Sequence, residues 1–145
     1  MLDRLTPQLA ALILRLSLGL VLLAHSLYLK MVVFTLPGTA EFFDSVGLPG
    51  LPGLLAYGVF LIEVLAGTGL IAGWHSRVWA LAVIPVLLGA TWVHAGNGWL
   101  FTNTGGGWEY PLFLTAMAVV QLCLGDGQYA LNARQSFVHH KEPHQ

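Results

Sequence analysis

Ionisable side chains inside otherwise apolar segments are the residues of this sequence best placed to do chemistry. His25, His94 and Glu109 come from three separate apolar runs. Counted at about 1.5 Å per helical residue, all three fall at a similar depth, near the same membrane boundary. Histidine and a carboxylate can transfer protons and hydrogen-bond a polar ligand. We therefore expect a polar pocket there that binds a quinone headgroup, an anion or a metal.

The surroundings of this expected pocket favour a quinone. Residues that could contact the ring or its oxygens lie nearby: Trp92, Trp99, Trp108, Tyr110 and Lys30. No H-x-x-H or H-E-x-x-H spacing is present, which disfavours a metal. The alternative is that each histidine is an ordinary hydrogen-bonded residue at a membrane boundary.

A second ionisable group lies deeper. Arg15 and Glu63 fall at nearly the same depth, about 12 and 15 Å from the opposite boundary. A charge in a membrane is costly unless it is paired, so we expect a structural Arg15–Glu63 ion pair. In the alternative reading, Glu63 carries protons or binds a ligand.

The elements that must position these residues are membrane helices. The 145-residue chain is 56% hydrophobic and only 9% charged, whereas a soluble domain carries about 25% charged residues. Four apolar runs are expected to span the bilayer, at residues 7–34, 54–73, 78–94 and 109–126. We predict an all-α membrane protein, a four-transmembrane-helix bundle forming one domain over residues 1–134, followed by a polar C-terminal tail at 135–145. A short interfacial helix, capped by Thr39 and ended by Gly47, is expected in the first outer loop.

Charge distribution predicts the orientation and excludes some partners. Four basic residues fall on the side of the termini, namely Arg4, Arg77, Arg134 and Lys141. The positive-inside rule therefore predicts that both termini are cytoplasmic. A net charge of −1 without a basic run gives no indication of nucleic-acid binding. The single cysteine, Cys123, excludes an intrachain disulfide.

The order of several short motifs resembles a known family. They are Leu14-Arg-Leu-Ser-Leu-Gly-Leu20, Gly73-x-x-x-Arg77, Val93-His94, Gly105-Gly-Gly-Trp-Glu-Tyr-Pro-Leu112 and Gly125-Asp-Gly127. Together they resemble the DoxX family of small bacterial membrane proteins, over about residues 14–132. The resemblance implies a four-helix protein of the bacterial inner membrane. It also implies that Arg15, His25, Glu63, His94 and Glu109 occupy positions that recur in the family. Asn132 departs from the pattern, because relatives often carry Asp there.

What the resemblance implies about function is a redox role. Some relatives, called DoxD, are subunits of a thiosulfate:quinone oxidoreductase, and others are linked to membrane oxidoreductase assemblies and oxidative stress. The chain has no haem, flavin or iron–sulfur signature, so we expect electrons to come from a protein partner or from the substrate. A homo-oligomer is an alternative to a protein partner. Two other functions stay open, a structural or assembly subunit without its own chemistry and a transporter of a small solute or protons.

Overall fold

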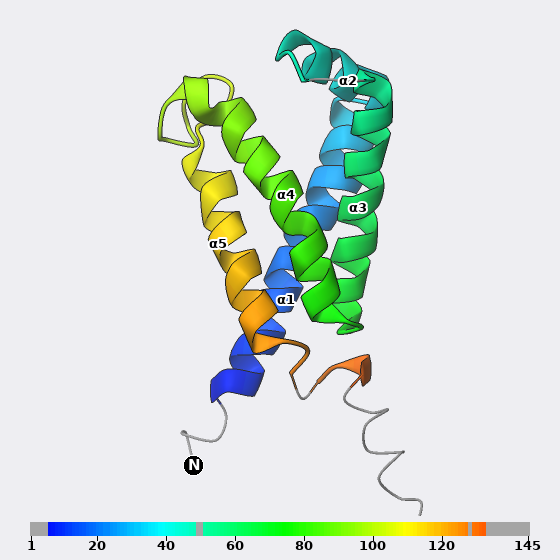
Figure 1. Ribbon diagram of the computed structural model, residues 1–145, viewed down its shortest axis with the longest axis vertical. Coiled ribbons are helices and arrows are strands. Elements are labelled where there is room, and N and C mark those ends of the chain that lie inside the picture. The colour runs from blue at the N-terminus through cyan, green and yellow to red at the C-terminus, as the bar shows by residue number, and fades with distance from the viewer. Residues whose placement is uncertain (1–5, 49–50, 128, 133–145) are drawn as a thin grey trace, which may run out of the picture.

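The chain folds into helices joined by short connections (Figure 1). The computed structural model describes residues 6–48, 51–127 and 129–132, and these residues contain no strand. Their helices are α1 (Thr6–Leu23), the π-helix η2 (Ala24–Val33), α2 (Leu36–Ser45), α3 (Pro52–Ala72), α4 (Ser76–His94), the 3-10 helix η3 (Ala95–Asn97) and α5 (Glu109–Leu124). The predicted all-α class is confirmed. The polar tail predicted at 135–145 lies outside the described residues.

Three helical segments are long and apolar enough to cross a membrane: Pro7–Val33, Gly53–Ala72 and Ser76–Asn97. They match the first three predicted spans to within three residues at each end. The fourth helix, α5, has 16 residues and is about 24 Å long, less than the roughly 30 Å hydrocarbon core. The described chain therefore has the helices of a multi-pass membrane protein, while a fourth crossing by α5 remains a prediction.

The four long helices form two pairs. α1 packs along α3, α4 packs along α5, and contacts of α3 with α4 and of α1 with α5 join the pairs. Figure 1 shows the pairs drawing apart toward the end that carries α2 and the loop 98–108, which we call the α2 end. The start of α1 and residues 125–127 and 129–132 lie at the opposite end, which we call the terminal end.

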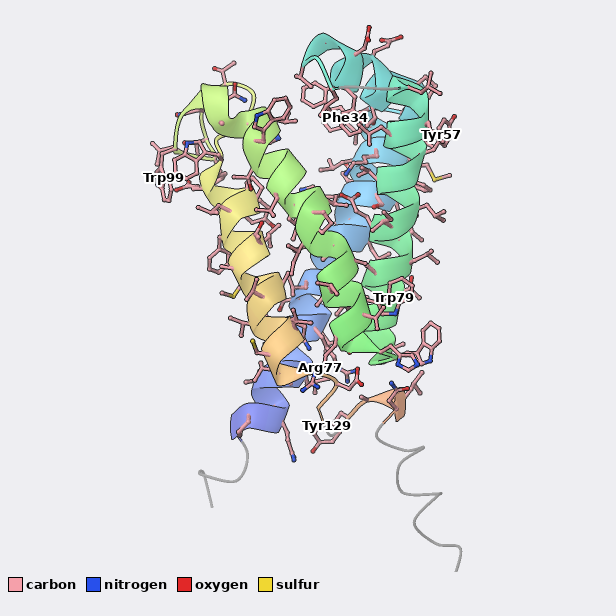
Figure 2. All side chains as sticks on the ribbon, in the orientation of Figure 1. Phe34, Tyr57, Arg77, Trp79, Trp99 and Tyr129 are labelled. Atoms are coloured by element: carbon pink, nitrogen blue, oxygen red, sulfur yellow. The ribbon has the colours of Figure 1, made fainter. Side chains whose placement is uncertain are left out.

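Glycines allow close contact between the helices. A Cβ on Gly19 of α1 would lie 2.8 Å from the carbonyl oxygen of Gly67 on α3, and a Cβ on Gly67 would lie 3.0 Å from the oxygen of Gly19. At the α3–α4 contact, the indole of Trp79 occupies the space beside Gly69, where a Cβ would lie 2.1 Å from its Nε1 (Figure 2). Small residues of this kind let membrane helices approach closely.

The centre of the bundle is apolar. All four long helices contribute to one buried cluster, which consists of Leu18, Leu22, Ala66, Leu70, Val83, Leu87, Leu114 and Ala118. Many other large apolar side chains are exposed, as expected for helices that face lipid. The cluster separates the polar groups of the two ends of the molecule.

The π-helix η2 continues α1 and was not predicted. Its wider turn is visible in the hydrogen bond from the Phe34 amide to the Leu29 carbonyl, five residues back, at 2.8 Å. Within this segment Ser26 and Lys30 both bond to Glu63 of α3. Such helices often occur at functional sites.

The first connecting segment differs in detail from its prediction. α2 begins at Leu36, and the Thr35 hydroxyl accepts a hydrogen bond from the Gly38 amide at 3.2 Å. Thr35 is therefore the cap, and the predicted cap Thr39 is wrong, because Thr39 is buried and donates its hydroxyl to the Thr35 carbonyl at 2.9 Å. The predicted contact of α2 with the membrane surface stays a prediction.

Candidate functional site

The loop 98–108 at the α2 end is held by hydrogen bonds of the Asn97 and Asn103 side chains. The Asn97 side-chain amide donates to the carbonyls of Gly105 and Gly106 at 3.0 and 2.9 Å. The Asn103 amide donates to the Asn97 carbonyl at 2.8 Å. Gly98, Gly105 and Gly106 all have positive φ, which side chains rarely tolerate. The loop therefore has a defined conformation, and it can position the residues of a binding site.

Glu109, the first residue of α5, ties this loop to the helix. Its Oε1 accepts a hydrogen bond from the Phe101 amide at 2.9 Å, and its own amide donates to the Trp99 carbonyl at 3.1 Å. A negative charge is also favourable at a helix N-terminus. These contacts explain why an acid stands at the start of an apolar helix. The Oε2 atom of Glu109 makes no hydrogen bond to the described residues, so it remains available to a ligand.

A pocket of about 480 Å³ lies beneath the loop, and we call it the headgroup pocket. Its lining includes Trp99, Phe101, Glu109, Tyr110, Leu112 and Phe113. Trp108 lies outside the lining and packs edge-on against Trp99, with ring centroids 4.5 Å apart. The structure thus brings together three of the residues expected to bind a cofactor or its protons, Trp99, Glu109 and Tyr110, with Trp108 behind them.

His25 lies next to this pocket. Its ring stacks on Tyr110 with centroids 6.2 Å apart and an angle of 25° between the planes. Its Nδ1 lies 2.9 Å from the Val21 carbonyl, and a carbonyl can only accept. The hydrogen-bond geometry therefore assigns a proton to Nδ1, and Nε2 of the neutral ring is an acceptor. Tyr110 links His25 to the pocket that contains Glu109.

His94 faces the loop instead. Its Nδ1 lies 3.5 Å from the Asn97 side-chain nitrogen, and a Cβ on Gly106 would lie 3.8 Å from its ring. His94 does not line the headgroup pocket, and nor does Trp92, whose side chain is largely exposed. Among residues 6–48, 51–127 and 129–132, no three His, Cys, Asp or Glu side chains could hold a metal ion. The catalytic and binding roles predicted for all these residues stay predictions.

Glu63 is paired with Lys30 rather than with Arg15. The Lys30 ammonium lies 2.7 and 2.9 Å from the two carboxylate oxygens of Glu63, and the Ser26 hydroxyl donates to Oε2 at 2.7 Å. Glu63 is nearly buried, and the Lys30 side chain is 16% exposed. The predicted Arg15–Glu63 ion pair is therefore wrong. Lys30, which was expected near the ligand, neutralises Glu63 and does not line the headgroup pocket.

Arg15 belongs to the terminal end. It is only 1% exposed, its Nη2 donates to the Tyr129 carbonyl, and the Asp126 carboxylate attracts it electrostatically. Its Nη1 fills the space beside Gly73, where a Cβ would lie 1.4 Å away. Figure 2 shows Tyr129 at this end of the bundle. A buried charge is costly unless it is compensated. The segment after α5 provides part of this compensation, while Nε and Nη1 of Arg15 have no hydrogen-bond partner among the described residues.

Asp126 organises the terminal end, and the sequence interpretation missed this. Its Oδ1 accepts a hydrogen bond from the Ser76 amide at the start of α4, at 2.6 Å, and its Oδ2 lies 3.3 Å from the Asn132 amide nitrogen. Burial alone would raise the pKa of Asp126, but the hydrogen bonds from Ser76 and Asn132 and the nearby His75 lower it below its ordinary value. The available signal was Asp126 between two glycines directly after an apolar run.

Comparison with known proteins supports the family resemblance. The DoxX family model matches residues 10–96, more than half of the 145 residues. A search of curated proteins and a search of solved structures each found no match to the chain. The matched part contains Arg15, His25, Glu63 and His94, and it ends before the loop 98–108 and α5.

Proposed function

Because the chain belongs to the DoxX family, we propose that it is a membrane subunit of, or an accessory to, a quinone-linked oxidoreductase system. In this proposal the quinone ring binds in the headgroup pocket. The observation that carries it is the grouping of a carboxylate, a phenol and an indole, from Glu109, Tyr110 and Trp99, around one pocket on a braced loop. Sites for flat, polar rings commonly combine aromatic walls with a few polar groups.

The arrangement of these side chains suits the proton transfers that accompany reduction of a quinone and oxidation of a quinol. Conversion of a quinone to a quinol takes up two electrons and two protons, and the reverse step releases them. Glu109 Oε2 can exchange a proton with one quinone oxygen while Oε1 stays bonded to Phe101. The His25 ring stacks on Tyr110, and its Nε2 can accept a proton by way of a water or the phenol. The electrons pass to or from a partner oxidoreductase subunit, or from the substrate.

The proposal also includes a location. We place the protein in the bacterial inner membrane with the terminal end toward the cytoplasm, because Arg77 lies at that end (Figure 2) and basic residues favour the cytoplasmic side. The headgroup pocket then lies in the outer leaflet. Protons exchanged there are released to, or taken from, the outer side.

A second candidate function is a structural subunit without its own chemistry. One observation favours it: polar groups in the bundle find partners within the chain. Glu63 pairs with Lys30 and Ser26, and Glu109 and His25 both bond to backbone groups. In this case substitutions in the headgroup pocket would leave ligand binding and activity unchanged. The third possibility, transport by a single copy of the chain, is disfavoured by the apolar cluster that separates the two polar ends.

Binding of decylubiquinone to the purified protein, measured by quenching of tryptophan fluorescence, tests the proposal. Trp99 and Trp108 are close enough to the pocket to report a bound quinone. The variant Glu109→Gln removes the charge but keeps an oxygen for the Phe101 amide, and Tyr110→Phe removes only a hydroxyl. The matched control is Tyr57→Phe, because Tyr57 is an exposed tyrosine of α3 on the side opposite Trp99 (Figure 2).

We expect wild type and Tyr57→Phe to bind equally. Tyr110→Phe should raise the Kd about fivefold, the effect of losing one neutral hydrogen bond to a quinone oxygen. Glu109→Gln should bind about as well as wild type, because its amide can donate to that oxygen. No saturable binding to wild type, or equal binding by all four proteins, would remove the quinone from the account and favour the structural subunit.

A further inference from the structure

A second cavity, of about 550 Å³, lies between α1 and α5, and we call it the α1–α5 groove. Its lining includes Ala10, Ser17 and Val21 of α1 and Tyr110, Phe113 and Met117 of α5. Apart from the Ser17 hydroxyl and the Tyr110 phenol, all of its lining side chains are apolar. From Ala10 to Val21 it follows α1 for about 16 Å, along the length of the bundle.

The α1–α5 groove adjoins the headgroup pocket. Tyr110 and Phe113 line both cavities. Most of the polar groups lie at one end of the two adjoining cavities, around Glu109, and apart from Ser17 the remaining lining of the groove is apolar. Near the other end, the turn that contains Gly127 packs against α1, since a Cβ on Gly127 would lie 3.1 Å from the Ala11 side chain. A ligand that fits both cavities has a flat polar head and a long apolar chain.

We infer that the α1–α5 groove binds the prenyl chain of the quinone, an inference that rests on the proposed function. A phospholipid acyl chain fits less well because of its headgroup. Among the described residues that line the two cavities, none is Lys or Arg, so a phosphate at the polar end would meet the Glu109 carboxylate without a compensating cation. A quinone ring is uncharged and its oxygens accept hydrogen bonds, which suits the phenol of Tyr110.

Filling the groove tests this inference. Ser17→Phe places a large side chain in the groove, and Ala10→Leu fills its far end by a smaller step. The matched control is Leu20→Phe, because Leu20 is a largely exposed residue of α1 that does not line the groove. Each protein is titrated with decylubiquinone and with the same benzoquinone ring without its chain. Partition of each quinone into detergent is the same for all variants, so comparison between variants isolates the protein.

We expect Ser17→Phe to raise the Kd of decylubiquinone about tenfold and to leave the Kd of the chain-free ring unchanged, with Ala10→Leu intermediate and Leu20→Phe like wild type. Unchanged decylubiquinone binding in both groove variants would overturn the inference, although the proposed function would stand. An equal rise in the Kd of both quinones would also overturn the inference, because the substitution would then weaken binding of the ring and not of the chain. Displacement of decylubiquinone by phosphatidylglycerol from wild type but not from Ser17→Phe would assign the groove to phospholipid instead. Failure of wild type to bind either quinone would be the separate failure of the proposed function.

Discussion

Glu63 illustrates how single residues decide which charges this bundle can contain. An unpaired carboxylate in a membrane helix is costly, but here both oxygens contact the Lys30 ammonium and one also accepts from Ser26. Removal of one member of such a pair leaves the other buried and uncompensated, whereas removal of both does not. The pair is therefore a structural requirement once either residue is present.

We predict that Lys30→Met and Glu63→Gln each destabilise the protein, Lys30→Met by about 3 kcal/mol because it leaves a charge behind. The double variant Lys30→Met/Glu63→Gln should recover much of this loss. Denaturant unfolding in a nonionic detergent measures the effect, with Glu41→Gln on the exposed face of α2 as the control. A double variant that loses the full sum of the two single effects would show that the two residues are not energetically coupled.

Asp126 is the residue whose charge should make stability depend on pH. Because its folded-state pKa is lowered, its contribution is fully present above its unfolded value of about 3.9 and is lost as the pH falls through the lower folded value. Asp126→Asn keeps an acceptor for the Ser76 amide but lacks the charge. We predict that its unfolding midpoint at pH 7 is about 2–4 °C below that of wild type, which corresponds to about 1 kcal/mol.

The difference between Asp126→Asn and wild type should shrink as the pH of the thermal scans falls below about 3.9 toward the acid limit. A constant difference from pH 7 to the acid limit would mean that hydrogen-bond geometry, and not the charge, stabilises the start of α4.

At this scale the sequence predicted which residues matter better than it predicted their partners. Arg15, Glu63 and Lys30 were all singled out because ionisable groups stand out in apolar runs. The pairing was wrong because depth counted at a fixed rise gives no direction around the helix. It also ignores the reach of a lysine and the wider turn of η2. The partners at the terminal end, Asp126 and the Tyr129 carbonyl, lie in a non-helical segment whose path the sequence does not specify.

Among the elements, the contact between α1 and α3 depends most on side-chain size. The backbones meet at Gly19 and Gly67, and the obstacles to a Cβ include carbonyl oxygens that cannot rotate away. The positions of three long helices were predictable because long apolar runs in a membrane protein have few other conformations. The π-helix was not predictable, because it coincides with the tertiary bonds of Ser26 and Lys30 rather than with a local signal.

We predict that Gly67→Ala and Gly19→Ala each lower stability by about 1–3 kcal/mol, the usual effect of overpacking. The matched control is Gly58→Ala on α3, where a Cβ would meet nothing within 4 Å. This control should be neutral or stabilising, because alanine favours a helix over glycine. Unfolding in detergent measures all three variants. Equal effects at Gly67 and Gly58 would show that the helices do not approach as closely as described.

In the molecule as a whole, two polar ends are separated by an apolar centre. Ser26, Lys30 and Glu63 lie on the α2 side of the apolar cluster, and Arg15, Ser76 and Asp126 lie on the terminal side. The sequence predicted a polar grouping near His25 and Glu109, and the structure places both beside Tyr110. It did not predict that His94 turns to the loop, because the hydrogen bonds of Asn97 that fold the loop give no signal in hydropathy.

Topology gives a prediction at this scale. In a Cys123→Ala background, a cysteine at Thr102 should react with a membrane-impermeant thiol reagent added outside intact cells, whereas a cysteine appended to the C-terminus should react only after the cells are opened. This pattern requires α5 to cross the membrane despite its 16 residues. Reaction of both cysteines from the same side would restrict the chain to three crossings.

The central claim, that the headgroup pocket binds a quinone ring, is tested most directly by photolabelling. A photoreactive azidoquinone would be irradiated with the purified protein, and the attachment sites would be mapped by mass spectrometry. We predict labelling within residues 99–113, lost when unmodified decylubiquinone competes. Labelling that is spread over the lipid-facing surface of α3 and α4, or that a competitor does not reduce, would contradict the account.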